Sequence, residues 1–311
     1  MFGGRGPDDL SGNAGNDTLV GIGGGHDILR GETGFDSFWC DPTDVIYDAD
    51  GWETFSGNTH RVASFRNGAS TELLGQDIAE PIGAGATTNL SDRPLFSSAG
   101  PSRDDIHQGY IGNCGTMAVM GAIADENPTR IRQSIVDLGD GTYAAEFHAF
   151  GVARHVRIDG DLPTWTAGDG AQGSIWVRLL EKAFATDRGS YAATEARWMS
   201  DVMSDFGRSP SSIWWGAWSS GSQFLTLVKA QLDSGKAVTV STNSAITSGA
   251  RVIAGHAYHV IAVDLAAGTI TLRNPWGFDG VGTDGNPLDG YVTVHASQVA
   301  NNFVVIQSAY A

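Results

Sequence analysis

Apolar residues from Thr116 onward follow two different periods. Helices are predicted by the nearly continuous apolar run from Thr116 to Ala124 and by the helical spacing of apolar residues from Trp176 to Ala185. The segment from Phe224 to Leu232 predicts another helix, which ends at Asp-Ser-Gly235. Strands are predicted by β-branched runs at 237–241, 256–264 and 269–273. Both helices and strands are therefore expected in this part of the chain.

The first 39 residues show a longer repeat. Asp8, Asp17, Asp27 and Asp36 recur at spacings of 9, 10 and 9 residues. Each aspartate follows a glycine-rich turn, and an apolar residue stands two positions after it. A flexible Gly/Asn/Asp-rich linker is the alternative interpretation, although a random linker does not hold phase over four units.

This pattern resembles the G-G-x-G-x-D-x-U-x nonapeptide of repeats-in-toxin proteins. The resemblance implies a short parallel β-roll over residues 1–39, with apolar residues inside it. It also implies that the aspartates and the turn carbonyls bind Ca²⁺, so Asp8, Asp17, Asp27 and Asp36 are candidate metal ligands.

The distribution of charge agrees with a cation-binding module. Residues 1–60 contain eleven Asp and Glu residues but only two Arg, an excess of nine negative charges within a net charge of −16. An acidic, glycine-rich segment suits Ca²⁺ and argues against nucleic acid as a partner, because nucleic acids bind basic patches.

Cys114 is the strongest candidate for a catalytic nucleophile. It follows a polar, glycine-rich stretch and opens the apolar helix, where the macrodipole and free backbone N–H groups favour the thiolate. The amide of Gln108, six residues upstream, can stabilise an oxyanion. A free cysteine is more often a small buried hydrophobe, so the assignment requires a base and a residue that orients it.

Two later segments supply these groups. His256 follows Gly255 at the start of a predicted strand, and Asn274 ends the next strand because Pro275 cannot continue a ladder. Adjacent strands would place the Asn274 amide oxygen on the imidazole N–H of His256, with Trp276 covering that bond.

Together these segments resemble the catalytic core of the calpain cysteine peptidases. The resemblance covers about residues 91–311 and includes, in order, Arg93-Pro-Leu-Phe96, Asp105-Ile-His-Gln108, Gly112-Asn-Cys114, Trp176-Val-Arg-Leu-Leu-Glu-Lys-Ala-Phe184, Gly189-Ser-Tyr191, Gly255-His256-Ala-Tyr and Asn274-Pro-Trp-Gly277. It implies an α+β fold of the two-lobed papain-like type, with Cys114 in a helical lobe and His256 and Asn274 in a β-rich lobe.

We therefore expect four parts along the chain. These are β-roll repeats at 1–39, a linker at 40–90, a helical lobe at 91–206 and a β-rich lobe at 207–311. The linker prediction depends on the mixture of short apolar pieces with Gly, Ser, Thr and Asn in that segment.

The calpain resemblance also implies a Ca²⁺ site near the active-site loop. Asp105 and Glu181 occupy the matching positions. The alternatives are a helix cap for Asp105 and a surface ion pair on a helix for Glu181.

The function implied by both resemblances is a Ca²⁺-dependent cysteine endopeptidase that acts on proteins or peptides. The family usually shows Gly-Asp-Cys-Trp, whereas this chain has Asn113 before the cysteine and Gly115 after it. These departures leave an alternative open, a catalytically silent module with a Ca²⁺-dependent binding or adhesive role. The oligomeric state stays open.

The expected location is outside a bacterial cell. No signal peptide and no membrane-spanning window are visible, and proteins that resemble repeats-in-toxin cargo leave bacteria without a signal peptide.

Overall fold

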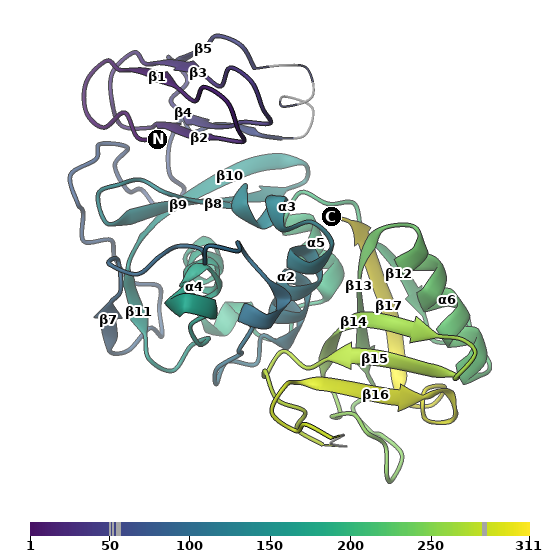
Figure 1. Ribbon diagram of the computed structural model, residues 1–311. Helices are drawn as coiled ribbons and strands as arrows, with labels where there is room; N and C mark the ends of the chain where they lie inside the picture. Colours follow the sequence, from purple (N-terminus) through teal and green to yellow (C-terminus); the bar gives the residue numbers. More distant parts are fainter. Residues whose placement is uncertain (50, 52, 54–56, 282–284) are drawn as a thin grey trace.

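The computed structural model describes residues 1–49, 51, 53, 57–281 and 285–311, which form three parts in chain order (Figure 1). A stack of parallel strands comes first. A lobe that contains most of the helices follows it, and a lobe built on an antiparallel sheet ends the chain. No helix among the described residues is both long enough and apolar enough to cross a lipid bilayer.

The N-terminal strands form two parallel sheets that alternate along the chain. One sheet contains β1 (Asp9–Ser11), β3 (Ile28–Arg30) and β5 (Val45–Ile46), and the other contains β2 (Thr18–Gly21), β4 (Ser37–Cys40) and β6 (Thr59–Arg61). The sheets enclose one cluster of buried residues: Leu10, Leu19, Leu29, Phe38 and Cys40. The apolar residue that follows each repeated aspartate thus lies inside, as the sequence predicted.

Successive turns of this stack approach each other closely. Gly34 has a φ of 153°, and a Cβ atom at this position would lie 1.7 Å from the carbonyl oxygen of Gly15 in the preceding turn. Only glycine fits such a contact, which explains why the repeats need this residue. The parallel pairing continues past residue 39 through β5 and β6, so it enters the segment predicted to be a linker.

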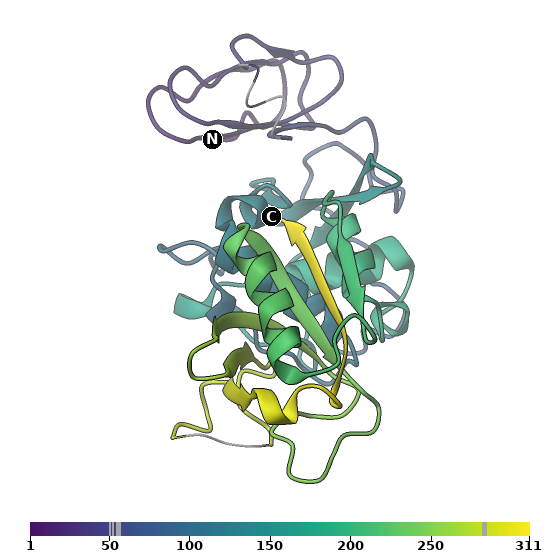
Figure 2. The ribbon, with the colours of Figure 1, turned by 90° about the vertical axis from the view of Figure 1, so that its right-hand side faces the viewer.

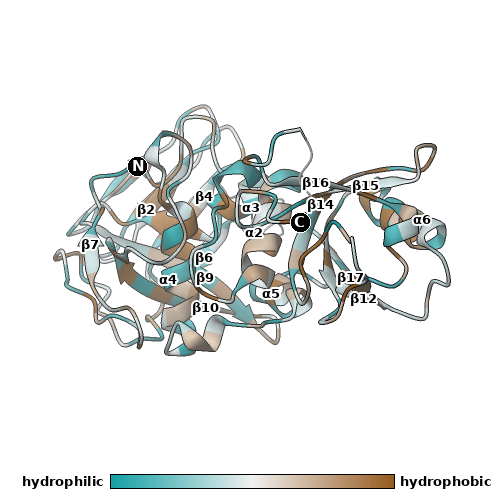
Figure 3. Ribbon diagram, turned by 90° about the horizontal axis from the view of Figure 1, so that it is seen from below, coloured by the Kyte–Doolittle hydropathy of each residue, from teal (hydrophilic) through white to brown (hydrophobic). Residues whose placement is uncertain are grey.

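The helical lobe is built around α2. It contains α2 (Cys114–Glu126), α3 (Pro128–Arg132), α4 (Trp176–Arg188), α5 (Met199–Asp205) and the 3₁₀ helix η1 (Arg103–Asp105). Its strands are β8 (Ile135–Asp137), β9 (Thr142–Ala149) and β10 (Val152–Asp159), which form an antiparallel sheet, and the pair β7 (Thr87–Asn89) and β11 (Asp161–Pro163). Residues 115–124 of α2 are all buried, which agrees with its pale to brown colour in Figure 3. An apolar helix with no polar face is a core helix.

The strand stack packs against the sheet of the helical lobe. Val20 and Trp39, on the outer face of the β2-β4-β6 sheet, share a buried cluster with Val136 of β8, Ala144 of β9 and Leu138 just after β8. The stack therefore lies directly over the β8–β10 sheet, as Figure 1 also shows.

The third part is a six-stranded antiparallel sheet in the order β12-β17-β13-β14-β15-β16. Its strands are β12 (Ser211–Trp214), β13 (Lys236–Thr242), β14 (Ala257–Asp264), β15 (Thr269–Arg273), β16 (Tyr291–His295) and β17 (Phe303–Tyr310). Helix α6 (Gly221–Asp233) packs on β13 and β14 and shares an apolar core with the sheet (Figure 2). The predicted lobe boundary at residue 206 falls between α5 and β12.

Two packing relations position the functional residues. Helix α2 contacts β13 and β14, so the start of this helix lies against the β-rich lobe. Strands β14 and β15 pair antiparallel with His259 opposite Arg273. His256 directly precedes β14 and Asn274 directly follows β15, so the two residues lie at the same end of this strand pair.

Candidate active site

Cys114 is the first residue of α2, at the end that faces the β-rich lobe. Its thiol is partly exposed, and the backbone N–H groups of Gly115 and Ala257 lie close enough to stabilise the thiolate. Ala257 directly follows His256, so this contact crosses between the two lobes. The sulfur of Cys114 therefore lies near the backbone of the residue that follows His256.

His256 and Asn274 are joined as the sequence analysis expected. Nε2 of His256 lies 2.9 Å from Oδ1 of Asn274, and both residues are buried. The indole of Trp276 covers the imidazole at a ring-centroid distance of 4.9 Å. Because the amide oxygen can only accept, Nε2 carries the proton and Nδ1 is the nitrogen left to accept another.

A cleft of about 750 Å³ is lined by Cys114, His256 and Trp276 together. Residues from both lobes line it: Gln108, Gly109, Tyr110, Ile111, Gly112 and Cys114 from the helical lobe, and Ile253, Ala254, Gly255, His256, Trp276 and Phe278 from the β-rich lobe. In the described structure no hydrogen bond links Cys114 to His256, whose side-chain partner is Asn274.

The electrostatics of this state differ from the sequence-based expectation. Burial raises the pKa of the Cys114 thiol, and the nearby backbone N–H groups offset this only in part. Burial also lowers the pKa of His256. Both changes favour the neutral thiol and the neutral imidazole, whereas the position of Cys114 at a helix N-terminus had predicted a thiolate.

Gln108 lines the cleft, but its amide is engaged within its own loop. Nε2 donates to the carbonyl of Ile111 at 2.6 Å, and the backbone N–H of Gln108 donates to Pro275 O at 2.8 Å. The second bond ties this loop to the Asn-Pro-Trp turn of the other lobe. One amide hydrogen of Gln108 remains available to an oxyanion in the cleft.

The two departures at Asn113 and Gly115 have packing explanations. Nδ2 of Asn113 donates to Oε1 of the buried Glu181 at 2.7 Å, where an aspartate would place two carboxylates face to face. A Cβ atom on Gly115 would lie 2.5 Å from the carbonyl oxygen of Arg197. A tryptophan therefore has no room at position 115.

The Gly115→Ala variant tests this packing account. Helix propensity alone would stabilise the variant by up to about 1 kcal/mol. We expect the opposite sign, a loss of about 1–3 kcal/mol, because the new methyl group overpacks against a backbone carbonyl. Urea unfolding followed by circular dichroism measures the difference. An increase in stability would show that the 197 segment moves away freely.

Asp105 and Glu181 are both buried and hold one loop at two points. Asp105 accepts hydrogen bonds from Ala171 N and Trp176 Nε1, both at 2.8 Å, and Glu181 accepts from Ala167 N at 2.8 Å. Burial raises the pKa of Glu181 to about 7. Glu181 is therefore not the surface helix residue that the alternative interpretation described, while Asp105 takes part in a capping box on η1.

The aspartates of the strand stack form two ladders. In the first, Asp8 N donates to Asp27 Oδ1 at 2.8 Å and Asp27 N donates to Asp44 Oδ1 at 3.0 Å. In the second, Asp17 N donates to Asp36 Oδ1 and Asp36 N donates to Glu53 Oε1, both at 2.8 Å.

Several carboxylates of the two ladders have a buried oxygen atom without a hydrogen-bond partner, which is energetically unfavourable. The Oδ2 atoms of Asp8, Asp17 and Asp27 are buried and have no hydrogen-bond partner. Burial and the neighbouring carboxylates of Asp44 and Asp8 raise the pKa of Asp27. Stacked, desolvated carboxylates with free oxygen atoms are a donor set that suits Ca²⁺.

A thiol at a helix N-terminus that shares a cleft with an asparagine-bound imidazole is an arrangement found in cysteine peptidases. Comparisons with known proteins agree. The family described as calpain family cysteine protease matches residues 85–286. Calpain-1 catalytic subunit of Mus musculus is 32% identical over 219 residues, which are 61% of this chain and 30% of that protein.

Other relatives match over a similar share of the chain. Calpain-8 of Mus musculus is 29% identical over 229 residues, 66% of this chain and 33% of that protein. Calpain-A of Drosophila melanogaster is 27% identical over 231 residues, 65% of this chain and 28% of that protein. The chain thus spans about a third of the length of these relatives. It belongs to the calpain family of cysteine proteases, and its catalytic domain is of the cysteine endopeptidase type.

Proposed function

We propose that the chain is a Ca²⁺-dependent cysteine endopeptidase in which Cys114 is the nucleophile, His256 the base and Asn274 the orienting residue. The observation that carries the proposal is the 2.9 Å bond between His256 and Asn274 beside the cleft that Cys114 also lines.

The chemistry follows from these three side chains. Nδ1 of His256 accepts the thiol proton, and the sulfur of Cys114 attacks the scissile carbonyl of a peptide in the cleft. The backbone N–H of Cys114 and the amide of Gln108 stabilise the oxyanion, with about 3–4 kcal/mol from one such donor. His256 then protonates the leaving amine, and water hydrolyses the acyl-enzyme. Asn274 fixes the tautomer throughout.

Calcium has a role at the loop between Asp105 and Glu181 in this proposal. Both carboxylates are buried and both accept hydrogen bonds from residues 167–171. A Ca²⁺ ion held by these carboxylates would compete with those bonds and shift residues 167–171, and Glu181 also bonds Asn113, the neighbour of Cys114. The described state, with a neutral thiol and imidazole, then corresponds to a resting enzyme.

Calcium also has a role in the strand stack. The free Oδ2 atoms of Asp8, Asp17 and Asp27 fit a repeats-in-toxin roll whose ladder aspartates, Asp36 included, bind the ion together with turn carbonyls. A secreted bacterial protein would meet millimolar Ca²⁺ outside the cell, and we propose that location for this chain. The proposed substrate is a protein or peptide.

The alternative is a catalytically silent calpain-like module with a Ca²⁺-dependent binding or adhesive role. Its main argument was the glycine at position 115. The contact between Gly115 and the Arg197 carbonyl gives that glycine a packing reason and so removes this argument.

Casein hydrolysis separates the two functions. We expect the chain to cleave casein with Ca²⁺, to lose activity when Ca²⁺ is chelated, and to lose at least about 10⁴-fold in rate in the Cys114→Ala variant. Ser219→Ala, an exposed substitution outside the cleft, is the control and should leave the rate unchanged. Hydrolysis that survives Cys114→Ala contradicts the assignment of the nucleophile. Equal inactivity of all the proteins favours the silent module.

A further inference from the structure

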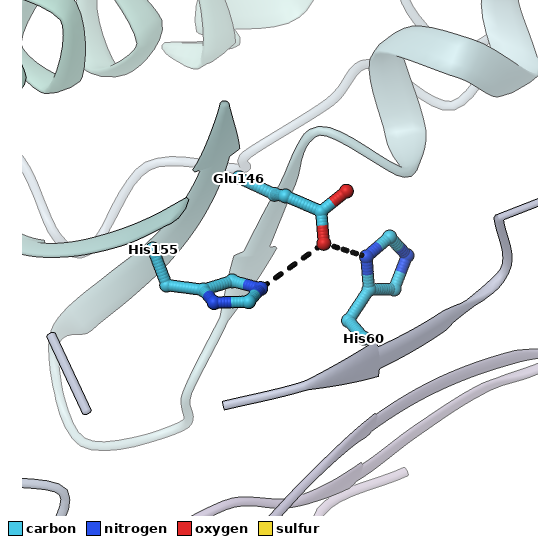
Figure 4. A group of neighbouring side chains, drawn as sticks. All are labelled: His60, Glu146 and His155. Carbon is cyan, nitrogen blue, oxygen red and sulfur yellow. Dashed lines mark hydrogen bonds and ion pairs between the residues drawn. The ribbon is translucent and has the colours of Figure 1, made fainter. Parts of the chain in front are cut away.

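Three side chains outside the active site meet where the strand stack packs on the helical lobe (Figure 4). His60 comes from β6 of the stack, and Glu146 and His155 come from the paired strands β9 and β10. Oε2 of Glu146 lies 2.7 Å from Nδ1 of His60 and 3.0 Å from Nε2 of His155. The proposed peptidase reaction uses none of these groups.

The cluster is closed off from solvent. His60, Glu146 and His155 are 0%, 5% and 7% exposed. The indole of Trp39 stacks on the His60 ring at 4.1 Å and meets the His155 ring edge-on at 6.1 Å. Nε2 of His60 has no hydrogen-bond partner, so this ring is held only through Nδ1 and through stacking. Such a concentration of polar groups in an apolar junction needs a compensating interaction.

The donor set has the composition of a zinc site. The two imidazole nitrogens and the carboxylate oxygen all lie within 4.8 Å of one another. Zinc takes His and carboxylate ligands at about 2.0–2.2 Å, which places tetrahedral donor atoms about 3.3 Å apart. Binding the ion would lengthen the two N···O spacings of 2.7 and 3.0 Å and set the separation of the two ring nitrogens, now within 4.8 Å, to the same value. Imidazole can ligate through either nitrogen, as His60 and His155 would here.

We propose that His60, Glu146 and His155 bind one Zn²⁺ ion, with water in the fourth position. The second oxygen of Glu146 faces Nε2 of His148 at 3.6 Å, and this contact would fix the orientation of the carboxylate. One ligand comes from the strand stack and two come from the helical lobe. The ion would thus join the two parts of the chain, and its affinity would be coupled to their docking.

Zinc binding is measured best in the full chain with Cys114→Ala, because the thiol and His256 could themselves bind the ion. The metal-free protein is titrated with zinc sulfate in excess Ca²⁺, against a chromophoric chelator as competitor. We expect one zinc ion per chain. His60→Gln and Glu146→Gln should each weaken zinc binding at least about 100-fold. Even the mutation of a residue that only hydrogen-bonds a metal ligand lowers metal affinity by about 10–100-fold. His295→Gln, an exposed histidine on the far lobe, should leave the affinity unchanged.

A second readout does not require a folded variant. Cobalt in place of zinc should give the visible absorption of a tetrahedral ion with nitrogen and oxygen ligands, and zinc should remove it stoichiometrically. Absence of zinc binding in the Cys114→Ala protein that carries no further substitution overturns the proposal and leaves a hydrogen-bonded His-Glu-His cluster. Affinity that is unchanged in both His60→Gln and Glu146→Gln overturns it as well.

Discussion

Replacing His256 by alanine is expected to lower kcat/KM for a peptide substrate by about 10⁴-fold or more. The variant keeps the thiol but loses the group that removes its proton and later protonates the leaving amine. Burial already raises the pKa of Cys114, so the thiol would stay protonated near neutral pH without this base. Hydrolysis of a fluorogenic peptide in saturating Ca²⁺ measures the change.

Two further variants make this result specific. Asn274→Ala should reduce the rate less than His256→Ala, because the base remains but its tautomer and orientation are no longer fixed. His295→Ala removes an exposed histidine of the same lobe and should retain the parental rate. If His256→Ala kept most of its activity while His295→Ala lost it, the assignment of the base would be wrong.

Local motifs were sufficient to predict the elements around the candidate site. The helix that starts at Cys114 and the strands beside His256 and Asn274 lie where the sequence placed them. The bond between His256 and Asn274 could be predicted because Pro275 stops one strand and Gly255 precedes the next, which leaves few possible registers.

Contacts between remote segments could not be predicted. The strand stack continues through Asp44 and Glu53, which extend the ladders although no glycine-rich turn precedes Asp44 and a glutamate replaces the aspartate at position 53. Gly115 left a catalytically silent module open as an alternative, because its packing reason, the approach of the Arg197 carbonyl, depends on a loop some 80 residues away. The cluster around Glu146 joins residues 60 and 155, and no local pattern connects them.

Removal of Ca²⁺ is expected to loosen the strand stack while the catalytic lobes stay folded. Without a cation, the ladder leaves stacked carboxylates with free, buried oxygen atoms, and the pKa of Asp27 is raised by burial and by its acidic neighbours. One ion at a concentration of 100 Kd stabilises a site by about 2.7 kcal/mol. Chelation should therefore accelerate hydrogen exchange about 100-fold at backbone amides of residues 3–39, with little change in α2.

Substitution of a ladder residue should have opposite effects in the two conditions. Asp27→Asn keeps an oxygen that can accept from Asp8 N but removes one negative charge. We expect slower exchange than in the parent protein under chelation, because repulsion is relieved, and faster exchange in Ca²⁺, because a ligand is weakened. Asp233→Asn at the exposed end of α6 should change neither rate. Exchange of residues 3–39 that is indifferent to chelator would exclude bound calcium from the ladders, because an ion held by those carboxylates must lower the free energy of the ordered stack.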